Sequence, residues 1–207
     1  MTEAILAQSE HCDALGDVLT RAFADDPLCS HVFPNRTRRL RKMRWIYVHW
    51  LRLFISRRLV YTTPELSGAA LWHRPEQGFD IGVWEQVQAG FLPVLFLLYP
   101  AEHIRGFRAH YDAVARMRQF VDKPHWVLDT LGVAPEYHRK GVARTMLQPV
   151  MYQADAEGIP CFVNTHNSVN VPFYERLGFQ VVHESLMPGT DITVYSFCRP
   201  PQSNRRG

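Results

Sequence analysis

The segment LGVAPEYHRKGVA, Leu131 to Ala143, decides the fold that this chain is expected to adopt. It leaves a strand predicted over 125–133, turns through a basic loop and opens a helix predicted over 141–156. A short apolar strand, CFVNT at 161–165, follows that helix. The strand, the helix and the second strand together predict a βαβ unit.

The turn inside this segment is suited to binding phosphate. Unpaired N–H groups point outward at the N-terminus of a helix, and the helix dipole there favours an anion. Gly141 and Ala143 keep bulk away from an approaching group, while His138, Arg139 and Lys140 add donors and charge. An ordinary strand-to-helix connection can have the same composition, so the turn alone leaves phosphate binding open.

A second motif, NVPFYERLGF at Asn170 to Phe179, follows the second strand and places Tyr174 on a short helix. With this motif, the region from about His125 to Val182 resembles the GNAT superfamily of acyl-CoA-dependent N-acyltransferases. Two shorter pieces, FADDP at Phe23 to Pro27 and ALWHRPE at Ala70 to Glu76, are similar to the puromycin N-acetyltransferase branch.

The resemblance implies one α/β (α+β) domain whose central twisted mixed sheet is flanked by helices and splays at the CoA site. Acetyl-CoA is the expected co-substrate, lying between the strand that ends at Val133 and the strand that ends at Thr165. Where the family usually has glutamine or arginine, this chain has His138, and an imidazole would make phosphate affinity depend on pH. The residues expected to bind the cofactor are Leu131, Gly132, Val133, His138, Arg139, Lys140, Gly141, Val142, Ala143, Asn164 and Asn170.

Tyr174 is the expected proton donor for the leaving thiolate. Its phenol has an ordinary pKa of about 10, so it stays protonated at neutral pH. The alternative is a core tyrosine, because Phe173 and Leu177 on the same short helix suggest packing.

Asp129 is the candidate base that deprotonates the amine. Strict alternation along the strand places it on one face with Leu131 and Val133, which are expected to meet CoA. The alternatives are a buried carboxylate bonded to neighbouring backbone, or a water chain to bulk solvent. Puromycin-like members tend to have a glutamate on the next strand, where this chain has Asn164.

The expected acceptor is an amine of a small molecule. Asp25, Asp26, Trp72, His73 and the segment 80–120 flank the place where family members admit their substrate. The two aspartates are equally suited to capping or ending a helix, and Trp72 to a place in the core. An acetyltransferase for peptide or protein amines, and a non-catalytic CoA-binding sensor on the same fold, are alternatives. A dinucleotide-binding oxidoreductase is set aside because the GxGxxG fingerprint is missing.

The rest of the sequence predicts helices and strands before and after this βαβ unit. One domain is expected over 1–199, with a disordered tail at 200–207. Proline is expected to interrupt the first helix at Pro27 and to kink the helix at Pro149. The other predicted elements are a strand at 2–7, helices at 14–23 and 37–55, a hairpin at 59–63 and 68–73, helical spacing over 80–120, a short helix at 168–177, and strands at 180–184 and 192–198.

Composition argues against several classes of function. A net charge of only +3 argues against nucleic-acid binding, and the basic residues from Arg36 to Arg44 alternate with apolar ones, as on the solvated face of an amphipathic helix. A contact of these residues with CoA phosphates is the alternative. The four cysteines lack metal-ligand spacing, so we expect no metal site and a reducing, cytoplasmic compartment. The apolar run 91–99 contains Pro93 and is too short to span a membrane, so a soluble monomer or homodimer is expected.

Overall fold

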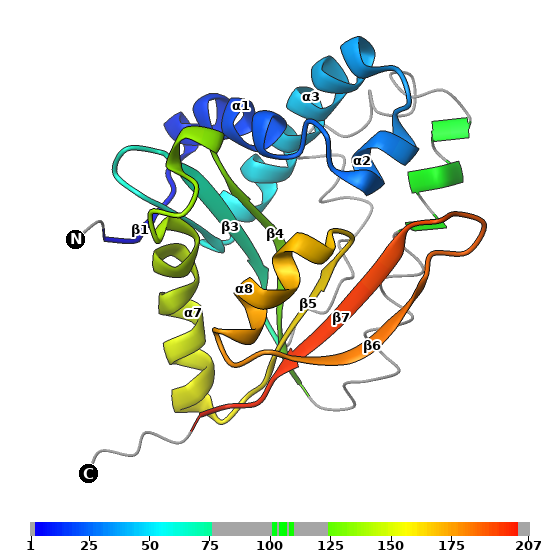
Figure 1. Ribbon diagram of the computed structural model, residues 1–207. Helices are drawn as coiled ribbons and strands as arrows, with labels where there is room; N and C mark the ends of the chain where they lie inside the picture. The colour runs from blue at the N-terminus through cyan, green and yellow to red at the C-terminus, as the bar shows by residue number, and fades with distance from the viewer. Residues whose placement is uncertain (1–2, 76–100, 103, 107, 110–123, 203–207) are drawn as a thin grey trace.

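The computed structural model describes residues 3–75, 101–102, 104–106, 108–109 and 124–202. Most of the helical segment predicted over 80–120 lies outside these residues. Within them, the predicted fold class is confirmed, because one mixed sheet carries helices on both faces (Figure 1).

The sheet of the described residues has seven strands in the order β1-β2-β3-β4-β5-β7-β6. Neighbouring strands are antiparallel, except for β4 and β5, which are parallel as the βαβ unit requires. The strands are β1 (Ile5–Leu6), β2 (Val60–Thr62), β3 (Gly68–His73), β4 (Trp126–Val133), β5 (Cys161–Thr165), β6 (Gln180–Leu186) and β7 (Thr193–Arg199).

Capping residues in the local sequence fix the start of one helix and the end of another. Asp26 accepts a hydrogen bond from the Cys29 amide and caps a short helix, so Pro27 starts this helix instead of only interrupting the preceding one. Helix α7 continues through Pro149 and is capped at its C-terminus by Gly158, whose φ of 69° is left-handed. The helices are α1 (Cys12–Ala22), α2 (Pro27–Val32), α3 (Arg36–Ser56), α7 (Val142–Glu157) and α8 (Val171–Glu175), with 3-10 turns η1 (Ser9–His11), η2 (Pro135–Tyr137) and η3 (Ser168–Asn170).

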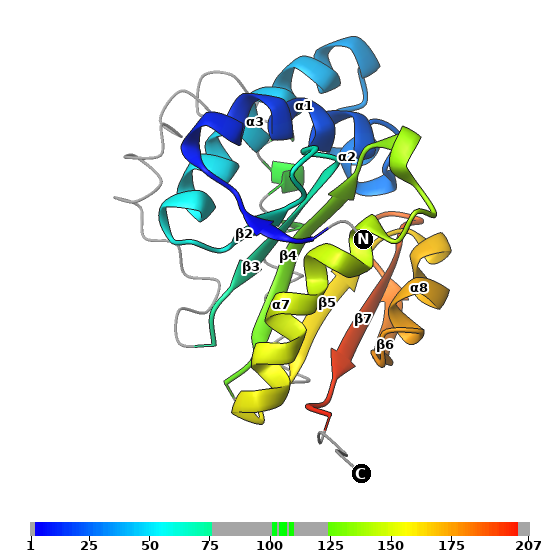
Figure 2. The same cartoon turned by 90° about the vertical axis from the view of Figure 1, so that its left-hand side faces the viewer.

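Helices α1 and α3 cover one face of the sheet, and α7 and α8 cover the other (Figure 2). One glycine on each face of the sheet lies directly under a covering helix. A Cβ on Gly132 of β4 would lie 2.5 Å from Leu19 of α1, and a Cβ on Gly68 of β3 would lie 2.8 Å from Met146 of α7. Each glycine therefore allows a helix to approach the sheet closely.

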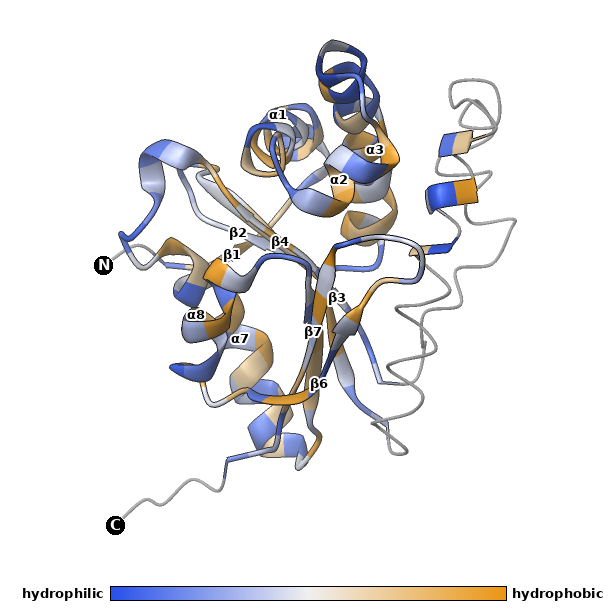
Figure 3. Ribbon diagram, turned by 45° about the vertical axis from the view of Figure 1, so that its right-hand side comes forward, coloured by the Kyte–Doolittle hydropathy of each residue, from blue (hydrophilic) through white to orange (hydrophobic). Residues whose placement is uncertain are grey.

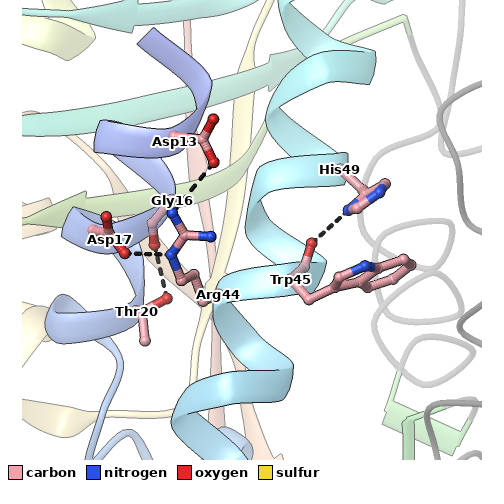
Figure 4. Close-up of polar contacts among 7 residues, drawn as sticks. All are labelled: Asp13, Gly16, Asp17, Thr20, Arg44, Trp45 and His49. Carbon is pink, nitrogen blue, oxygen red and sulfur yellow. Dashed lines mark hydrogen bonds and ion pairs between the residues drawn. The ribbon is translucent and has the colours of Figure 1, made fainter.

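Helix α1 packs against α3 through another glycine (Figure 4). A Cβ on Gly16 would lie 2.5 Å from Cγ2 of Val48, so a larger residue here would push the helices apart. Arg44 of α3 reaches across to Asp17 at 2.6 Å and to Asp13 at 3.2 Å. These ion pairs are exposed and contribute little free energy, so the apolar contact at Gly16 determines the spacing.

The basic stretch at the start of α3 only partly forms the solvated face predicted for it. Figure 3 shows this end of the helix as strongly hydrophilic. Arg39 and Lys42 are nevertheless buried, and they pair with Asp25 and Glu102 respectively. The prediction was wrong for these two residues because each has an acidic partner, which allows a charged side chain to be buried. The partner of Lys42 is distant in sequence.

The end of β7 is fixed to α7 by a buried arginine. The Arg199 guanidinium donates to both carboxylate oxygens of Asp155, at 2.7 and 2.8 Å, and to the Leu177 carbonyl at 3.0 Å. Asp155 also accepts the Gln202 amide at 2.7 Å, so the described start of the tail is bonded to the domain. Burial opposes ionisation of Asp155, but the hydrogen bonds from Arg199 and Gln202 lower its pKa below the ordinary value.

Replacing Asp155 with alanine is expected to destabilise the protein by about 3 kcal/mol, because a buried Arg199 is then left unpaired. Because its pKa is lowered in the folded protein, Asp155 stabilises the fold at any pH above its unfolded pKa of about 3.9. This stabilisation is lost as the pH falls through the folded pKa. Urea unfolding at neutral pH and near pH 3 measures both effects. Asp13→Ala, which removes an exposed partner of Arg44, is the control and should change little. Equal losses in the two variants would contradict the prediction.

Candidate active site

Strands β4 and β5 separate at the centre of the sheet. Their pairing runs from Trp126 opposite Cys161 to Leu128 opposite Val163 and then ends, although both strands continue. Beyond Leu128, the edge of β4 that faces β5 makes no ladder with it, so backbone groups there are available to another molecule. The predicted splay is therefore present.

A cavity of about 620 Å³ lies at the carboxyl end of β4. Ten of the residues predicted to bind CoA or to act on it line this cavity, namely Leu131, Gly132, Val133, His138, Arg139, Gly141, Val142, Ala143, Asn170 and Tyr174. The prediction missed nine others, which are Arg21, Ala22, Phe23, Tyr137, Arg144, Asn167, Val169, Phe173 and Arg176. The remaining lining residues, Asp25 and Asp26, were expected near the acceptor.

The basic loop presents backbone donors to the cavity. Arg139 and Gly141 have left-handed φ values of 60° and 81°, and α7 begins directly after Gly141. Within the described part of the chain, the N–H groups of residues 139–144 donate no hydrogen bond. A Cβ on Gly141 would have nothing within 4 Å, so this end of the helix is open. The arrangement fits a phosphate group.

Four arginines line the same cavity as these donors. Arg139 and Arg144 belong to the loop and the first turn of α7, and Arg176 follows α8. Arg21 of α1 also lines the cavity, where it pairs with Glu136 at 2.9 Å. Guanidinium groups bind phosphate oxygens well, so the arginines and the backbone N–H groups of the cavity both favour an anionic ligand.

The other two basic side chains of the loop have local partners. His138 Nε2 lies 3.0 Å from the Val133 carbonyl, so a protonated Nε2 donates to the end of β4. The Lys140 ammonium lies 5.2 Å from the centre of the Tyr137 ring, and Lys140 does not line the cavity. Its predicted cofactor contact stays a prediction, and in this structure the side chain lies over an aromatic ring.

Tyr174 belongs both to the core and to the cavity. Its ring contacts Phe173, Phe179 and Phe197 at centroid distances of 5.2, 5.6 and 5.2 Å. The residue is only 5% exposed, yet it lines the cavity, and its hydroxyl makes no hydrogen bond to the described residues. Burial raises the pKa of the phenol above its ordinary value. The side chain is therefore a neutral donor at neutral pH.

Asp129 lies at a β-bulge, which overturns its predicted orientation. The register passes from Leu71 opposite Thr130 to Trp72 opposite Leu128, so Asp129 has no partner on β3. An extra residue of this kind resets the alternation of side chains. Asp129 consequently points towards α3, and the expectation that it shares a face with Leu131 and Val133 was wrong.

Three side chains donate hydrogen bonds to the Asp129 carboxylate. They are Trp50 Nε1 at 2.8 Å, Thr130 Oγ1 at 2.7 Å and His73 Nε2 at 3.2 Å. Burial alone would raise the pKa of Asp129, but the bonds from His73, Trp50 and Thr130 lower it below the ordinary value. Asp129 is thus close to the alternative role considered from the sequence, a buried carboxylate, except that its hydrogen-bond partners are side chains and not backbone groups. It stays ionised and is a weak base.

The other residues expected near the acceptor have structural roles. Asp26 caps α2, and Asp25 pairs with Arg36 at 3.3 Å. Trp72 is fully buried in the core, and His73 is buried beside Asp129. The capping and core alternatives therefore describe Asp26 and Trp72 correctly.

Asn164 does not line the cavity, in contrast to its predicted cofactor contact. Its neighbour Val163 is the register partner of Phe197, whose ring contacts Tyr174 of α8 on the face that α7 also covers. Because side chains alternate along a strand, Asn164 points to the face opposite α7. The prediction had assigned Asn164 without allowing for this alternation.

Among the residues with assigned positions, no three histidine, cysteine or acidic side chains are arranged to hold a metal ion. Likewise, none of the helices in this part of the chain is both long and apolar enough to cross a membrane.

The Acetyltransferase (GNAT) family matches the chain over residues 49–179, which include the splayed strands, the basic loop and Tyr174. The chain belongs to this family. Acetyl-CoA is the co-substrate that the family uses. The predicted family and co-substrate are thereby confirmed, whereas the narrower resemblance to puromycin N-acetyltransferases stays a prediction.

Known relatives agree with this assignment. An uncharacterized N-acetyltransferase of Schizosaccharomyces pombe is 26% identical over 168 residues, which are 78% of this chain and 67% of the relative. Among solved structures, arylalkylamine N-acetyltransferase 2 of Aedes aegypti superposes with a TM-score of 0.65, at 14% identity, covering 97% of this GNAT chain and 99% of the mosquito chain. PaiA N-acetyltransferase of Thermoplasma acidophilum, solved in complex with coenzyme A, gives 0.57 at 16% identity, covering 97% and 99%. At these identities, the two structures establish the fold alone.

Proposed function

We propose that this GNAT chain transfers the acetyl group of acetyl-CoA directly to an amine of a small molecule. One observation carries the proposal. Arg139, the residues 141–144 whose N–H groups donate no hydrogen bond within the described chain, and the buried Tyr174 line one cavity at the point where β4 and β5 separate. An anion site and a proton donor in one cavity suit a phosphate-bearing thioester.

The residues present fit acetyl-CoA along the whole cavity. The backbone of Leu131, Gly132 and Val133 supports bonding to the pantetheine amides, because this edge of β4 is not paired with β5. The loop donors at 139–144 support binding of the pyrophosphate, with Arg139, Arg144 and Arg176 supplying charge. Asn170 lines the same wall, where it donates to Thr165 at 3.0 Å.

Amine attack needs a proton donor and a proton acceptor. The amine nitrogen attacks the thioester carbonyl carbon, the C–S bond breaks, and the sulfur takes a proton, which we assign to the Tyr174 phenol. Asp129 accepts the proton of the amine, directly or through water. Its carboxylate is 14% exposed and lies at the level where β4 and β5 part, which supports this role. It does not line the cavity, and its lowered pKa makes it a weak proton acceptor, so the role depends on the test below.

Asp129→Asn is expected to lower kcat/KM by about tenfold to 100-fold near neutral pH, because the amide cannot accept the proton. The lowered pKa keeps Asp129 ionised throughout the pH 6–10 range, so its own titration does not shape the profile there. The loss should diminish as the pH approaches the pKa of the amine, since solvent then supplies neutral amine.

A kcat/KM profile over pH 6–10 measures this effect, with Asp17→Asn at an exposed ion pair as the control. A loss that is equal at every pH would assign Asp129 a positioning role only. No loss at all would exclude it as the base.

The proposed activity is tested by thiol release from acetyl-CoA with a panel of amines. The panel contains puromycin, tryptamine, spermidine, kanamycin, L-phenylalanine and a short peptide with an unblocked N-terminus. Release with a small amine supports the proposal, and the puromycin-like branch predicts that puromycin is among the substrates. Release with the peptide alone would favour a peptide acetyltransferase. Tight acetyl-CoA binding without any release would favour the CoA-binding sensor.

A further inference from the structure

The charged side chains that line the cavity include two of each sign that bear on its ligands in different ways. Arg139, Arg144 and Arg176 form no ion pair with any described residue, so their charges are available to the phosphate groups of acetyl-CoA. The turn between α1 and α2 adds the carboxylates of Asp25 and Asp26 to the lining. Carboxylates repel phosphate groups, so these two are suited to a ligand other than the cofactor.

Asp26 carries the one carboxylate of this lining whose charge is not balanced by a described residue. Asp25 pairs with Arg36 at 3.3 Å and with Arg39 at 3.8 Å. Asp26 forms no ion pair with the described residues, and one of its oxygens accepts the Cys29 amide at 3.1 Å. No other N–H or O–H group in this part of the chain donates to Asp26. Capping α2 thus occupies one carboxylate oxygen and leaves the charge unneutralised.

The negative charge of Asp26 acts in partly dehydrated surroundings. Asp26 is half-buried, and Sγ of the nearby Cys29 lies 3.9 Å from the hydroxyl of Tyr47. Burial raises the pKa of the Cys29 thiol and of the Tyr47 phenol, and the Asp26 charge raises both further. Both groups are neutral at neutral pH, so neither offsets the carboxylate. A charge that is partly removed from water attracts a cation more strongly than one on the open surface does.

The side chain of Phe23 joins this turn to the strand that is proposed to hold the cofactor. Phe23 lines the cavity, and a Cβ on Gly132 of β4 would lie 3.0 Å from its ring. Asp26 follows Phe23 by three residues, which is at most about 10 Å of backbone. Asp26 therefore lies within reach of a small substrate whose other end meets the pantetheine arm along β4. The Phe23 ring adds to the site, because an aromatic ring also attracts a cation.

We infer that Asp26 binds a second positive charge on the acceptor amine, an inference that rests on the proposed function. The nitrogen that attacks the thioester must be neutral, so a carboxylate that binds a cation holds a different group of the substrate. The three unpaired arginines of the lining repel the same cation, which orients the substrate with its charged end at Asp26. The substrate class is a small amine with a second cationic group, such as a diaminoalkane.

Matched pairs of diamines and monoamines test the inference. The probes are the unbranched diaminoalkanes from 1,3-diaminopropane to 1,8-diaminooctane, each compared with the 1-aminoalkane of the same length. The members of a pair differ only in the second charged group. The wild-type kcat/KM for at least one diamine should exceed that for its monoamine by at least about tenfold, because a hydrogen bond to a charged group contributes that much to affinity.

Asp26→Asn removes the charge and keeps the cap, because asparagine caps a helix as well as aspartate does. The preference for the diamine should disappear in this variant, while the melting temperature changes little and the Kd for acetyl-CoA does not rise. Asp26→Ser, which also retains a capping side chain, should give the same results, so the test does not depend on a single variant folding. Asp17→Asn is the control, since it removes an exposed carboxylate of α1 that does not line the cavity, and it should keep the preference.

Three results overturn the inference and leave the proposed function intact. The first is that the wild type acetylates an amine but prefers no diamine to its monoamine. The second is a diamine preference that persists in both Asp26 variants. The third is an equal loss of preference in Asp17→Asn, because that loss indicates a general effect of net charge. If the wild type releases thiol with no amine of either series or of the panel, the proposed function fails and the inference fails with it.

Discussion

Tyr174→Phe is expected to lower kcat by about 100-fold or more with little change in acetyl-CoA affinity. The variant loses a phenolic proton that is needed when the thiolate leaves, and an interaction used mainly in the transition state affects kcat more than binding. The ring contacts with Phe173, Phe179 and Phe197 do not involve the hydroxyl, so phenylalanine preserves them. Steady-state kinetics and calorimetry with acetyl-CoA measure the two quantities separately.

The pH profile adds a second observable for Tyr174. Burial raises its phenol pKa above the ordinary value of about 10, so the wild-type enzyme should show no loss of kcat from phenol ionisation below pH 10. Tyr152→Phe, on the exposed side of α7, is the control and should behave as wild type. An unchanged kcat in Tyr174→Phe, with chemistry limiting the rate, would reject the proton-donor role.

Gly141→Glu is expected to weaken acetyl-CoA binding by at least about 100-fold. The new carboxylate lies at the start of α7, where the helix dipole and the unpaired N–H groups favour an anion, so it competes with and repels the phosphate groups. The stabilisation that acetyl-CoA gives to the wild-type protein should disappear as well, since a ligand stabilises only the state that it binds. Calorimetry and thermal melting with acetyl-CoA measure both effects.

The other end of α7 supplies a matched control. Gly158 also has a left-handed φ, 69° against 81° at Gly141, and a Cβ at either glycine would meet nothing within 4 Å. Gly158→Glu therefore introduces the same charge and a similar backbone strain at the end of the helix away from the cavity. It should keep the wild-type affinity. Equal affinity in the two glutamate variants would show that the loop does not bind phosphate.

Local patterns predicted much of this fold. The apolar runs around LGVAPEYHRKGVA place β4, α7 and β5 within a residue or so of their observed ends. The loop and Tyr174 line one cavity as expected, because both motifs immediately follow strands that meet at the same edge of the sheet.

Features that depend on contacts between distant segments were not predictable. The bulge at Asp129 leaves no mark in the alternation of its strand, yet it turns the side chain towards Trp50 of α3. Arg21 reaches the cavity from α1, which is more than a hundred residues away from the loop in sequence. Lys42 is buried only because Glu102 meets it. Each case depends on tertiary structure and not on the local sequence.

The central claim is direct transfer of acetyl from acetyl-CoA to an amine, and product stoichiometry tests it most directly. Wild-type protein is mixed with acetyl-CoA and each panel amine, and released thiol, acetylated amine and acetate are quantified together, the last two by mass spectrometry. The account predicts one molecule of acetylated amine for each thiol released, with little acetate, and a rate that falls about 100-fold in Tyr174→Phe. Thiol release matched by acetate, with no acetylated amine at any pH between 6 and 10, would contradict it.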